Sequence, residues 1–163
     1  MLGPPGSGKS TIGAELGKHG LRWREWEQEL LGRWAGREAF AANKLAALTE
    51  FWERVLVLAD ADPAPLVFES TGLSDADFLD RIQRERRDTL VVRLDVSEAE
   101  SARRVAARPG GQHFSDEVEP NREVWRAFNR HVVPGRKVDL ALDTSRMDRH
   151  SAAVAVLALL SAR

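Results

Sequence analysis

The stretch Met1–Thr11, MLGPPGSGKST, decides the fold of this 163-residue chain. Within it, Gly3, Gly8, Lys9 and Ser10 have the spacing G-x-x-x-x-G-K-[ST] of a phosphate-binding (Walker A) loop. Glycines let successive backbone N–H groups turn toward phosphate oxygens, the lysine adds a positive charge, and the serine hydroxyl can hold Mg²⁺. Chance would place these four residues correctly in only about one chain of this length in a hundred. The residues expected to bind a nucleotide are Gly3, Gly6, Ser7, Gly8, Lys9, Ser10 and Thr11.

The composition excludes several classes of function. The chain has 24 basic and 25 acidic residues, a net charge of -1, which does not favour nucleic acid or an anionic membrane as partner. It has no cysteine, so disulfides, thiolate metal sites and a cysteine nucleophile are excluded. No apolar run approaches the roughly 20 residues of a membrane span. We expect a cytoplasmic monomer or homodimer.

The four histidines show no metal-ligand spacing in the sequence, so no histidine metal site is expected. They are His19, His113, His131 and His150.

The order of predicted elements is that of an α/β protein. Apolar spacing predicts helices over residues 9–19, 45–59, 75–86, 98–107, about 119–133 and 148–160. Short apolar runs rich in β-branched residues predict strands at 66–70, 89–97 and 138–145, and a short strand leading into a helix at 21–27. Strands and helices alternate, which favours a parallel sheet in a single domain over residues 1–163.

From Gly3 to about Leu160 the chain resembles the small P-loop kinases, the group that holds shikimate kinase, gluconate kinase, adenylate kinase and adenylylsulfate kinase. The resemblance implies a three-layer α/β/α sandwich with parallel strands in the order 2-3-1-4-5. It also implies ATP and Mg²⁺ as cofactors, a small molecule with a hydroxyl group as phosphoryl acceptor, an acceptor-binding region at about residues 23–60 and a lid at about 104–120.

Two acids after the first helix match a stretch of shikimate kinase in which an aromatic residue precedes two aspartates. Here the stretch is GLRWREWEQELL, with Trp23 as the aromatic and Glu25 and Glu27 as the acids. By resemblance, Trp23 belongs to the acceptor site, Glu25 and Ser10 organise Mg²⁺, and Glu27 accepts a hydrogen bond from a substrate hydroxyl. The alternative is an ordinary solvated charge run at a helix start.

The stretch LVFESTGLS (Leu66–Ser74) ends a predicted strand with an acid and small polar residues. Ligands of open α/β sheets collect beyond the carboxyl ends of strands. We therefore expect Glu69 to be a second acid or base, and Ser70, Thr71 and Gly72 to bind the acceptor. Alternatively, Ser74 or a neighbour caps the following helix.

Arginines near the predicted lid complete the candidate site. In RRVAARPGG (Arg103–Gly111) the resemblance implies that Arg104 stacks on adenine and that Arg108 reaches the transferring phosphate, where a planar cation meets spread negative charge. Arginines so spaced are also common on solvated helices. In NREVW, Arg122 corresponds to an arginine that binds an acidic substrate.

The chain departs from shikimate kinase where that enzyme binds its substrate. In GREAFAAN, Ala41 stands where the enzyme has a carboxylate-binding arginine, and Gly72 is what remains of a glycine triplet. These differences argue against shikimate as substrate. The function expected is transfer of the γ-phosphoryl group of ATP to a hydroxyl, with Lys9, Glu25, Glu69 and Arg108 as catalytic residues.

Two other functions stay open. One is an ATP-binding or ATPase module that couples the nucleotide to a partner, although its expected Asp-Glu pair at a strand end is missing. The other is a truncated, inactive form. Only Met1 and Leu2 precede the loop, where this fold has a central strand of about five residues. We expect the reading frame to continue upstream with a Val/Ile/Leu-rich strand.

Overall fold

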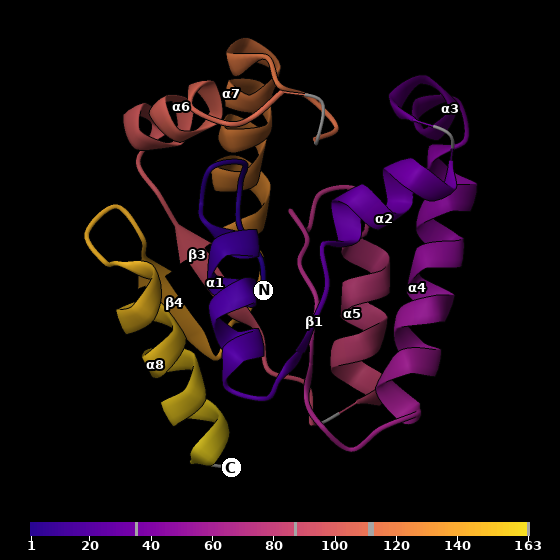
Figure 1. Ribbon diagram of the computed structural model, residues 1–163, viewed down its shortest axis with the longest axis vertical. Coiled ribbons are helices and arrows are strands. Elements are labelled where there is room, and N and C mark those ends of the chain that lie inside the picture. Colours follow the sequence, from indigo (N-terminus) through magenta and orange to yellow (C-terminus); the bar gives the residue numbers. More distant parts are fainter. Residues whose placement is uncertain (35, 87, 111–112, 163) are drawn as a thin grey trace.

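The computed structural model describes residues 1–34, 36–86, 88–110 and 113–162 (Figure 1). Its strands are β1 (Arg22–Trp23), β2 (Leu66–Val67), β3 (Val92–Asp95) and β4 (Leu140–Asp143). Its helices are α1 (Lys9–Lys18), α2 (Trp26–Arg33), α3 (Arg37–Ala42), α4 (Lys44–Asp60), α5 (Ala76–Glu85), α6 (Glu98–Ala106), α7 (Val118–Ala127) and α8 (Arg149–Ser161), with a π-helical turn η1 (Phe128–Val132) directly after α7.

The strands of the described residues form two parallel pairs, β1 with β2 and β3 with β4. Leu2 stands between the pairs, because it forms parallel bridges with both Ser70 and Arg93. Its N–H donates to Val92 O and its carbonyl accepts from Leu94 N, both at 2.8 Å. On the other side, Gly3 N donates to Ser70 O at 3.1 Å. The α/β class with parallel strands is confirmed, whereas the five-stranded order 2-3-1-4-5 stays a prediction.

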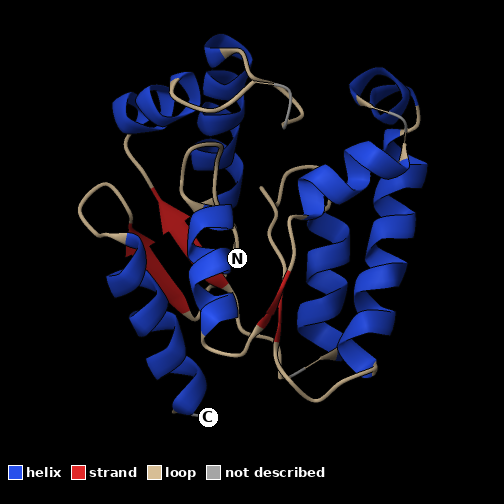
Figure 2. Cartoon of the chain, in the orientation of Figure 1, coloured by secondary structure: helices blue, strands red, loops and turns tan. Residues whose placement is uncertain are grey.

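Two apolar clusters lie on opposite sides of the strands, because successive strand residues point to opposite faces. The first joins α1 and α8 and contains Ile12, Leu16, Val67, Val92, Leu94, Leu142, Ala152, Ala153 and Val156. The second holds the large side chains of α2, α4 and α5, among them Trp26, Phe51, Trp52, Leu79 and Ile82. Figure 2 shows β1 and β2 between α1 and the helices α2, α4 and α5, and it shows β3 and β4 on the side of α8.

The second cluster is built on aromatic rings. Trp52 packs edge-on to Phe51 and Phe68, with ring centroids 5.0 Å apart in each pair, and stacks on Phe78 at 4.3 Å. The indole N–H of Trp26 donates to Val67 O at 3.2 Å, which ties α2 to the strand. This cluster therefore fixes α2, and with it the acids of the predicted acceptor region.

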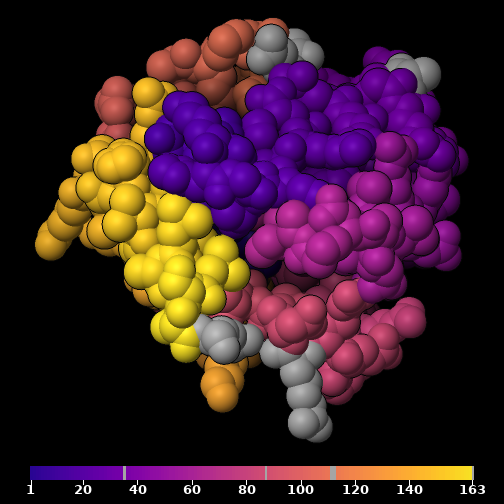
Figure 3. Space-filling view, turned by 60° about the horizontal axis from the view of Figure 1, so that its bottom comes forward, coloured from indigo at the N-terminus to yellow at the C-terminus, as the bar shows by residue number. Residues whose placement is uncertain are grey.

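The space-filling view shows the N-terminal segment lying against the C-terminal helix α8 (Figure 3). Among the helices of the described residues, none has the length and apolar character needed to cross a membrane.

The boundaries differ from the sequence predictions in several places, and the strands predicted at 89–97 and 138–145 are shorter, Val92–Asp95 and Leu140–Asp143. Helix α3 was not expected, the strand predicted at 66–70 contains only Leu66–Val67, and the helix predicted over about 119–133 ends in the π-helical turn η1. Residues 111 and 112 of the predicted lid lie outside the described residues.

Candidate active site

The phosphate loop runs from Gly3 to the start of α1, and close contacts require glycine at two of its positions, Gly3 and Gly6. A Cβ on Gly3 would lie 2.4 Å from Ser7 Oγ. Gly6 has φ +73°, and a Cβ there would lie 2.7 Å from Ser101 O on α6. The Ser101 hydroxyl donates to Pro5 O at 2.8 Å. The loop is therefore seated on α6, with the N-terminal end of α1 directly after it.

Lys9 is the first residue of α1, and its side chain turns back into the phosphate loop. Its Nζ donates hydrogen bonds to Gly3 O at 2.8 Å and Pro4 O at 3.1 Å. Burial lowers the pKa of Lys9, while the nearby charges of Glu69 and Glu27 act in the opposite direction. The loop thus surrounds an ammonium group that is positioned to meet phosphate oxygens.

Ser10 and Glu69 form the polar contact at the head of α1. Ser10 Oγ donates to Glu69 Oε1 at 3.0 Å, with Oε2 at 3.2 Å. Glu69 follows β2, so two segments far apart in the sequence meet here. Burial raises the pKa of Glu69, although Lys9 and Ser10 oppose the rise. The pair supplies hydroxyl and carboxylate oxygens next to the phosphate loop.

Glu27 reaches the same charge cluster from the first turn of α2. Its negative charge favours the protonated forms of Lys9 and Arg108 and contributes to the raised pKa of Glu69. Burial lowers the pKa of Arg108, and the carboxylates of Glu27, Asp116 and Glu69 oppose the change. Lys9, Glu27, Glu69 and Arg108 come from four separate segments and are linked electrostatically, and their roles in catalysis and substrate binding stay predictions.

Two residues of the predicted lid, His113 and Phe114, contact Glu27 directly. The carboxylate accepts a hydrogen bond from Phe114 N and lies 3.3 Å from His113 Nδ1. Sequence reasoning missed both lid residues, because nothing local in residues 108–120 marks a partner on α2.

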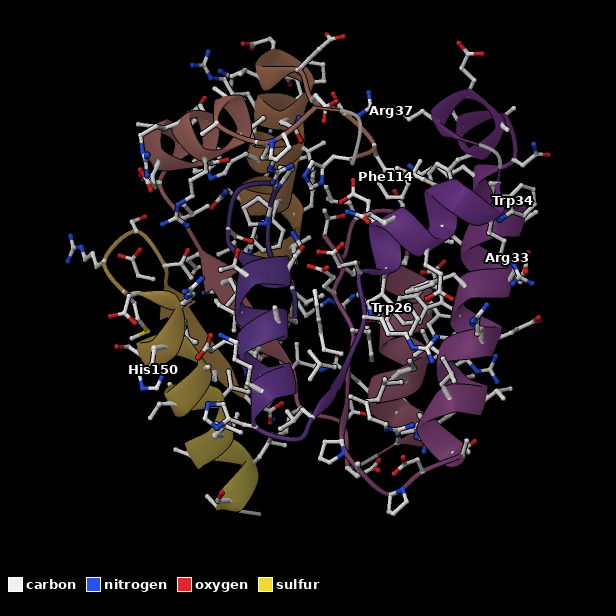
Figure 4. All side chains as sticks on the ribbon, in the orientation of Figure 1. Trp26, Arg33, Trp34, Arg37, Phe114 and His150 are labelled. Atoms are coloured by element: carbon white, nitrogen blue, oxygen red, sulfur yellow. The ribbon has the colours of Figure 1, made fainter. Side chains whose placement is uncertain are left out.

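Two further contacts join the lid to α3. Arg37 Nη2 donates to Asp116 Oδ2 at 2.5 Å, and the rings of Phe40 and Phe114 stack with centroids 4.3 Å apart. Figure 4 shows Arg37 and Phe114 near each other at the end of the molecule that carries α3. The lid thus spans from the α6–α7 side to the α2–α3 side.

The remaining predicted acids and aromatics lie elsewhere. Glu25 is the exposed N-cap residue of α2, while the carboxylate bonded to Ser10 is that of Glu69. Trp23 packs against α1, where a Cβ on Gly13 would lie 2.0 Å from its indole nitrogen. The metal role of Glu25 and the substrate role of Trp23 stay predictions.

The predicted acceptor residues after β2 form a compact turn. Ser70 Oγ donates to both carboxylate oxygens of Asp75, at 2.8 and 2.6 Å, and accepts from Gly72 N at 2.7 Å. Thr71 is half-buried, and Gly72 has φ +71°. Burial raises the pKa of Asp75, with the Ser70 hydrogen bond acting against it. The serine therefore already holds the start of α5.

The two remaining arginines have protein partners. Arg104 donates to Gly6 O at 3.1 Å and Thr144 O at 2.7 Å, so it ties the phosphate loop to the turn after β4. Arg122 pairs with Glu119 at 3.1 Å and lies 3.9 Å from Glu98. Thr11 is exposed on α1. Their roles toward adenine, substrate and phosphate stay predictions.

Solved structures resemble the chain over almost its whole length. Shikimate kinase from Acinetobacter baumannii in complex with shikimate has a TM-score of 0.71 at 18% identity, over 99% of this chain and 90% of that one. Deoxyadenosine kinase from M. mycoides with bound dATP has a TM-score of 0.56 at 17% identity, over 98% and 97%. No protein-family model and no curated protein matches the sequence. The chain therefore has the fold of the P-loop kinases.

Proposed function

We propose that the chain is a phosphotransferase that moves the γ-phosphoryl group of Mg²⁺-bound ATP to a hydroxyl group of a small molecule. The observation that carries the proposal is the phosphate loop itself, with the Lys9 ammonium inside it and the Ser10–Glu69 hydrogen bond at the head of α1. The fold shared with two kinases supports it. The strand order 2-3-1-4-5 belongs to the same proposal, and the bridges of Leu2 to Ser70 and Arg93 support it.

The donor groups at the loop fit both proposed cofactors. Backbone N–H groups of residues 6–10 and the ammonium of Lys9 suit the phosphates of ATP. Mg²⁺ prefers oxygen ligands and usually keeps several waters, so the Ser10 hydroxyl and the Glu69 carboxylate suit it directly or through water, with Glu25 as a further candidate. When bound, the ion neutralises charge that develops on the phosphate oxygens.

Different residues of the chain have different roles in phosphoryl transfer. Glu27 and Glu69 are the carboxylates that can orient the acceptor hydroxyl and take its proton, and burial raises the pKa of Glu69, which suits it to accept a proton. Arg108 stabilises charge on the transferring group. Contacts of the lid with Glu27 and α3 exclude water, which limits hydrolysis of ATP.

The acceptor is proposed to be an alcohol without a carboxylate or phosphate group. In the predicted acceptor region the arginine side chains already have acidic partners: Arg24 and Arg54 pair with Glu29, Arg33 with Glu50 and Arg37 with Asp116. Arg122 is likewise paired with Glu119. An anionic acceptor that used one of these arginines would have to break its ion pair, and it would approach the carboxylate of Glu27.

Release of ADP tests the proposal with matched acceptors, such as sorbitol against gluconate and glycerol against glycerate. We expect release to depend on an uncharged acceptor and to fall by about 100-fold or more in Lys9→Ala, which removes one preorganised cation. Lys18→Ala is the control, because Lys18 lies at the other end of α1 and pairs with Glu15.

The outcomes separate the alternatives. Equal rates in the native protein and Lys9→Ala would contradict the phosphotransferase. A Lys9-dependent rate that no acceptor increases would indicate an ATPase module instead. A preference for gluconate and glycerate would leave the kinase standing and overturn the choice of acceptor.

A further inference from the structure

Three side chains that commonly ligate metals meet on the surface outside the candidate active site. Glu15 lies on α1, His19 follows one helical turn later at the end of that helix, and His150 lies in the first turn of α8. Their ligand atoms all lie within 4.8 Å of one another. Figure 4 shows His150 on the far side of the molecule from Arg37 and Phe114.

We propose that Glu15, His19 and His150 bind a divalent transition metal of the zinc class, which cross-links α1 to α8. Two imidazole nitrogens and one carboxylate oxygen are ligands that zinc accepts, and three protein ligands leave a fourth tetrahedral position for water. Imidazole suits Zn²⁺, Cu²⁺ and Ni²⁺, whereas Mg²⁺ and Ca²⁺ prefer oxygen ligands. The site is therefore distinct in chemistry from the oxygen-rich Ser10–Glu69 pair.

The carboxylate is already held between the two helices. The Glu15 side chain is only 12% exposed, and its Oε1 lies 3.7 Å from His150 Nδ1. Helices α1 and α8 share the first apolar cluster through Ile12, Leu16 and Val156, which fixes the distance between the ligands. The site thus needs only side-chain rotation, and little ordering of the backbone, to surround an ion.

Two cations compete with the metal for Glu15. Lys18 Nζ lies 2.8 Å from Oε2, and Arg149 Nε lies 4.0 Å from the same oxygen. Their positive charge opposes a bound cation, and Lys18 must release the carboxylate when the metal binds. Because of this competition, removal of Lys18 should strengthen metal binding, even though it removes a surface ion pair.

Titration of Zn²⁺ into protein without an affinity tag or nucleotide tests the site by calorimetry. The chain has no cysteine, so thiols contribute nothing to the signal. We expect one ion per chain, and His19→Ala and His150→Ala each to weaken binding at least about tenfold, which corresponds to about 1.4 kcal/mol. Zn²⁺ in large excess over its dissociation constant should raise Tm by about 5 °C or more, whereas Mg²⁺ should not.

Matched variants make the result decisive. His131→Ala removes an exposed histidine on η1 and should leave the zinc affinity unchanged. Lys18→Ala should increase it. Zinc binding that survives the double variant His19→Ala/His150→Ala, or no zinc binding by the native chain, would overturn the proposal. None of these outcomes depends on whether the chain is a kinase, because the readouts are binding and stability.

Discussion

Gly6 combines a left-handed backbone with a close contact, since a Cβ would lie 2.7 Å from Ser101 O. We expect Gly6→Ala to lower the free energy of unfolding by about 2–3 kcal/mol, because strain and the clash with a backbone oxygen add. Denaturant unfolding measures the loss. Gly20→Ala is the control, since Gly20 has φ +86° and nothing within 4 Å of the added Cβ. Strain alone should cost about 1–2 kcal/mol there. Equal losses would contradict the role given to the contact.

The charge of Glu69 makes stability depend on pH. Burial raises its pKa above the ordinary value of 4.5, so the folded chain holds the proton more tightly than the unfolded chain. The resulting stability is fully present below pH 4.5 and is lost as the pH rises through the raised pKa.

Glu69→Gln removes this dependence while keeping the shape of the side chain. We expect it to raise Tm at pH 7 by about 2–4 °C, to flatten the change of Tm above pH 4.5, and to lower phosphotransfer. Thermal unfolding at several pH values is the measurement. A lower Tm at pH 7 would mean that attraction to Lys9 outweighs the cost of burial.

The sequence indicates single candidate residues, but it does not indicate which of them contact one another. The loop pattern found Lys9 and Ser10, because four residue types at fixed spacing report local backbone geometry. It did not find that Glu69, rather than Glu25, contacts Ser10, since that choice depends on how the end of β2 lies against α1. The sequence did not indicate that His19 and His150 lie close together, because the helices that carry them are distant in the sequence.

At the scale of elements, the sequence predicts the longer helices but not the short helix α3. Helices α4, α5, α6 and α8 were predicted to within two residues at each end, because the apolar residues of α4 keep helical spacing and the other three lie between the predicted strands or after the last one. Helix α3 has six residues and one buried side chain, Phe40, which is too little periodicity to detect. In the π-helical turn η1, Phe128 and Val132 are buried, and no local pattern in the sequence marks the change of helix type.

The contacts between the lid and α3 predict how readily the lid opens. We expect Arg37→Ala to increase chymotrypsin cleavage after Phe114 by up to about fivefold, because the ion pair with Asp116 contributes up to about 1 kcal/mol. Phe114 is 40% exposed and therefore within reach of the protease once the segment opens. Mass spectrometry locates and times the cut.

Arg33→Ala is the matched control for this experiment. Arg33 belongs to the same region but pairs with Glu50 on α4, so its removal should leave the cleavage rate unchanged. If both variants accelerated cleavage equally, the effect would come from general loosening of the α2–α4 region and not from the lid contact.

At the scale of the whole molecule, Leu2 joins the two strand pairs. Its backbone bonds to β3 on one side, while its side chain is 2% exposed in the second apolar cluster. We expect Leu2→Ala to lower the free energy of unfolding by about 2–4 kcal/mol, as for other buried leucines. Leu45→Ala, on a side chain that is 81% exposed, should change it by less than about 0.5 kcal/mol. Denaturant titration of both variants measures the two changes. A small loss of unfolding free energy in both would contradict the stabilising role of the buried Leu2 side chain.

The hydrogen bond from Phe114 N to Glu27 has a consequence for how an acceptor would bind. If Glu27 accepts a hydrogen bond from the acceptor hydroxyl, Phe114 N of the lid competes for the same carboxylate. Because the lid belongs to the same chain, its effective concentration does not change when the protein is diluted. The measured affinity is then the intrinsic affinity multiplied by the fraction of molecules in which the lid has released Glu27. A weak apparent affinity for the acceptor would therefore reflect the chain's own occupation of its site and would not by itself indicate a poor fit.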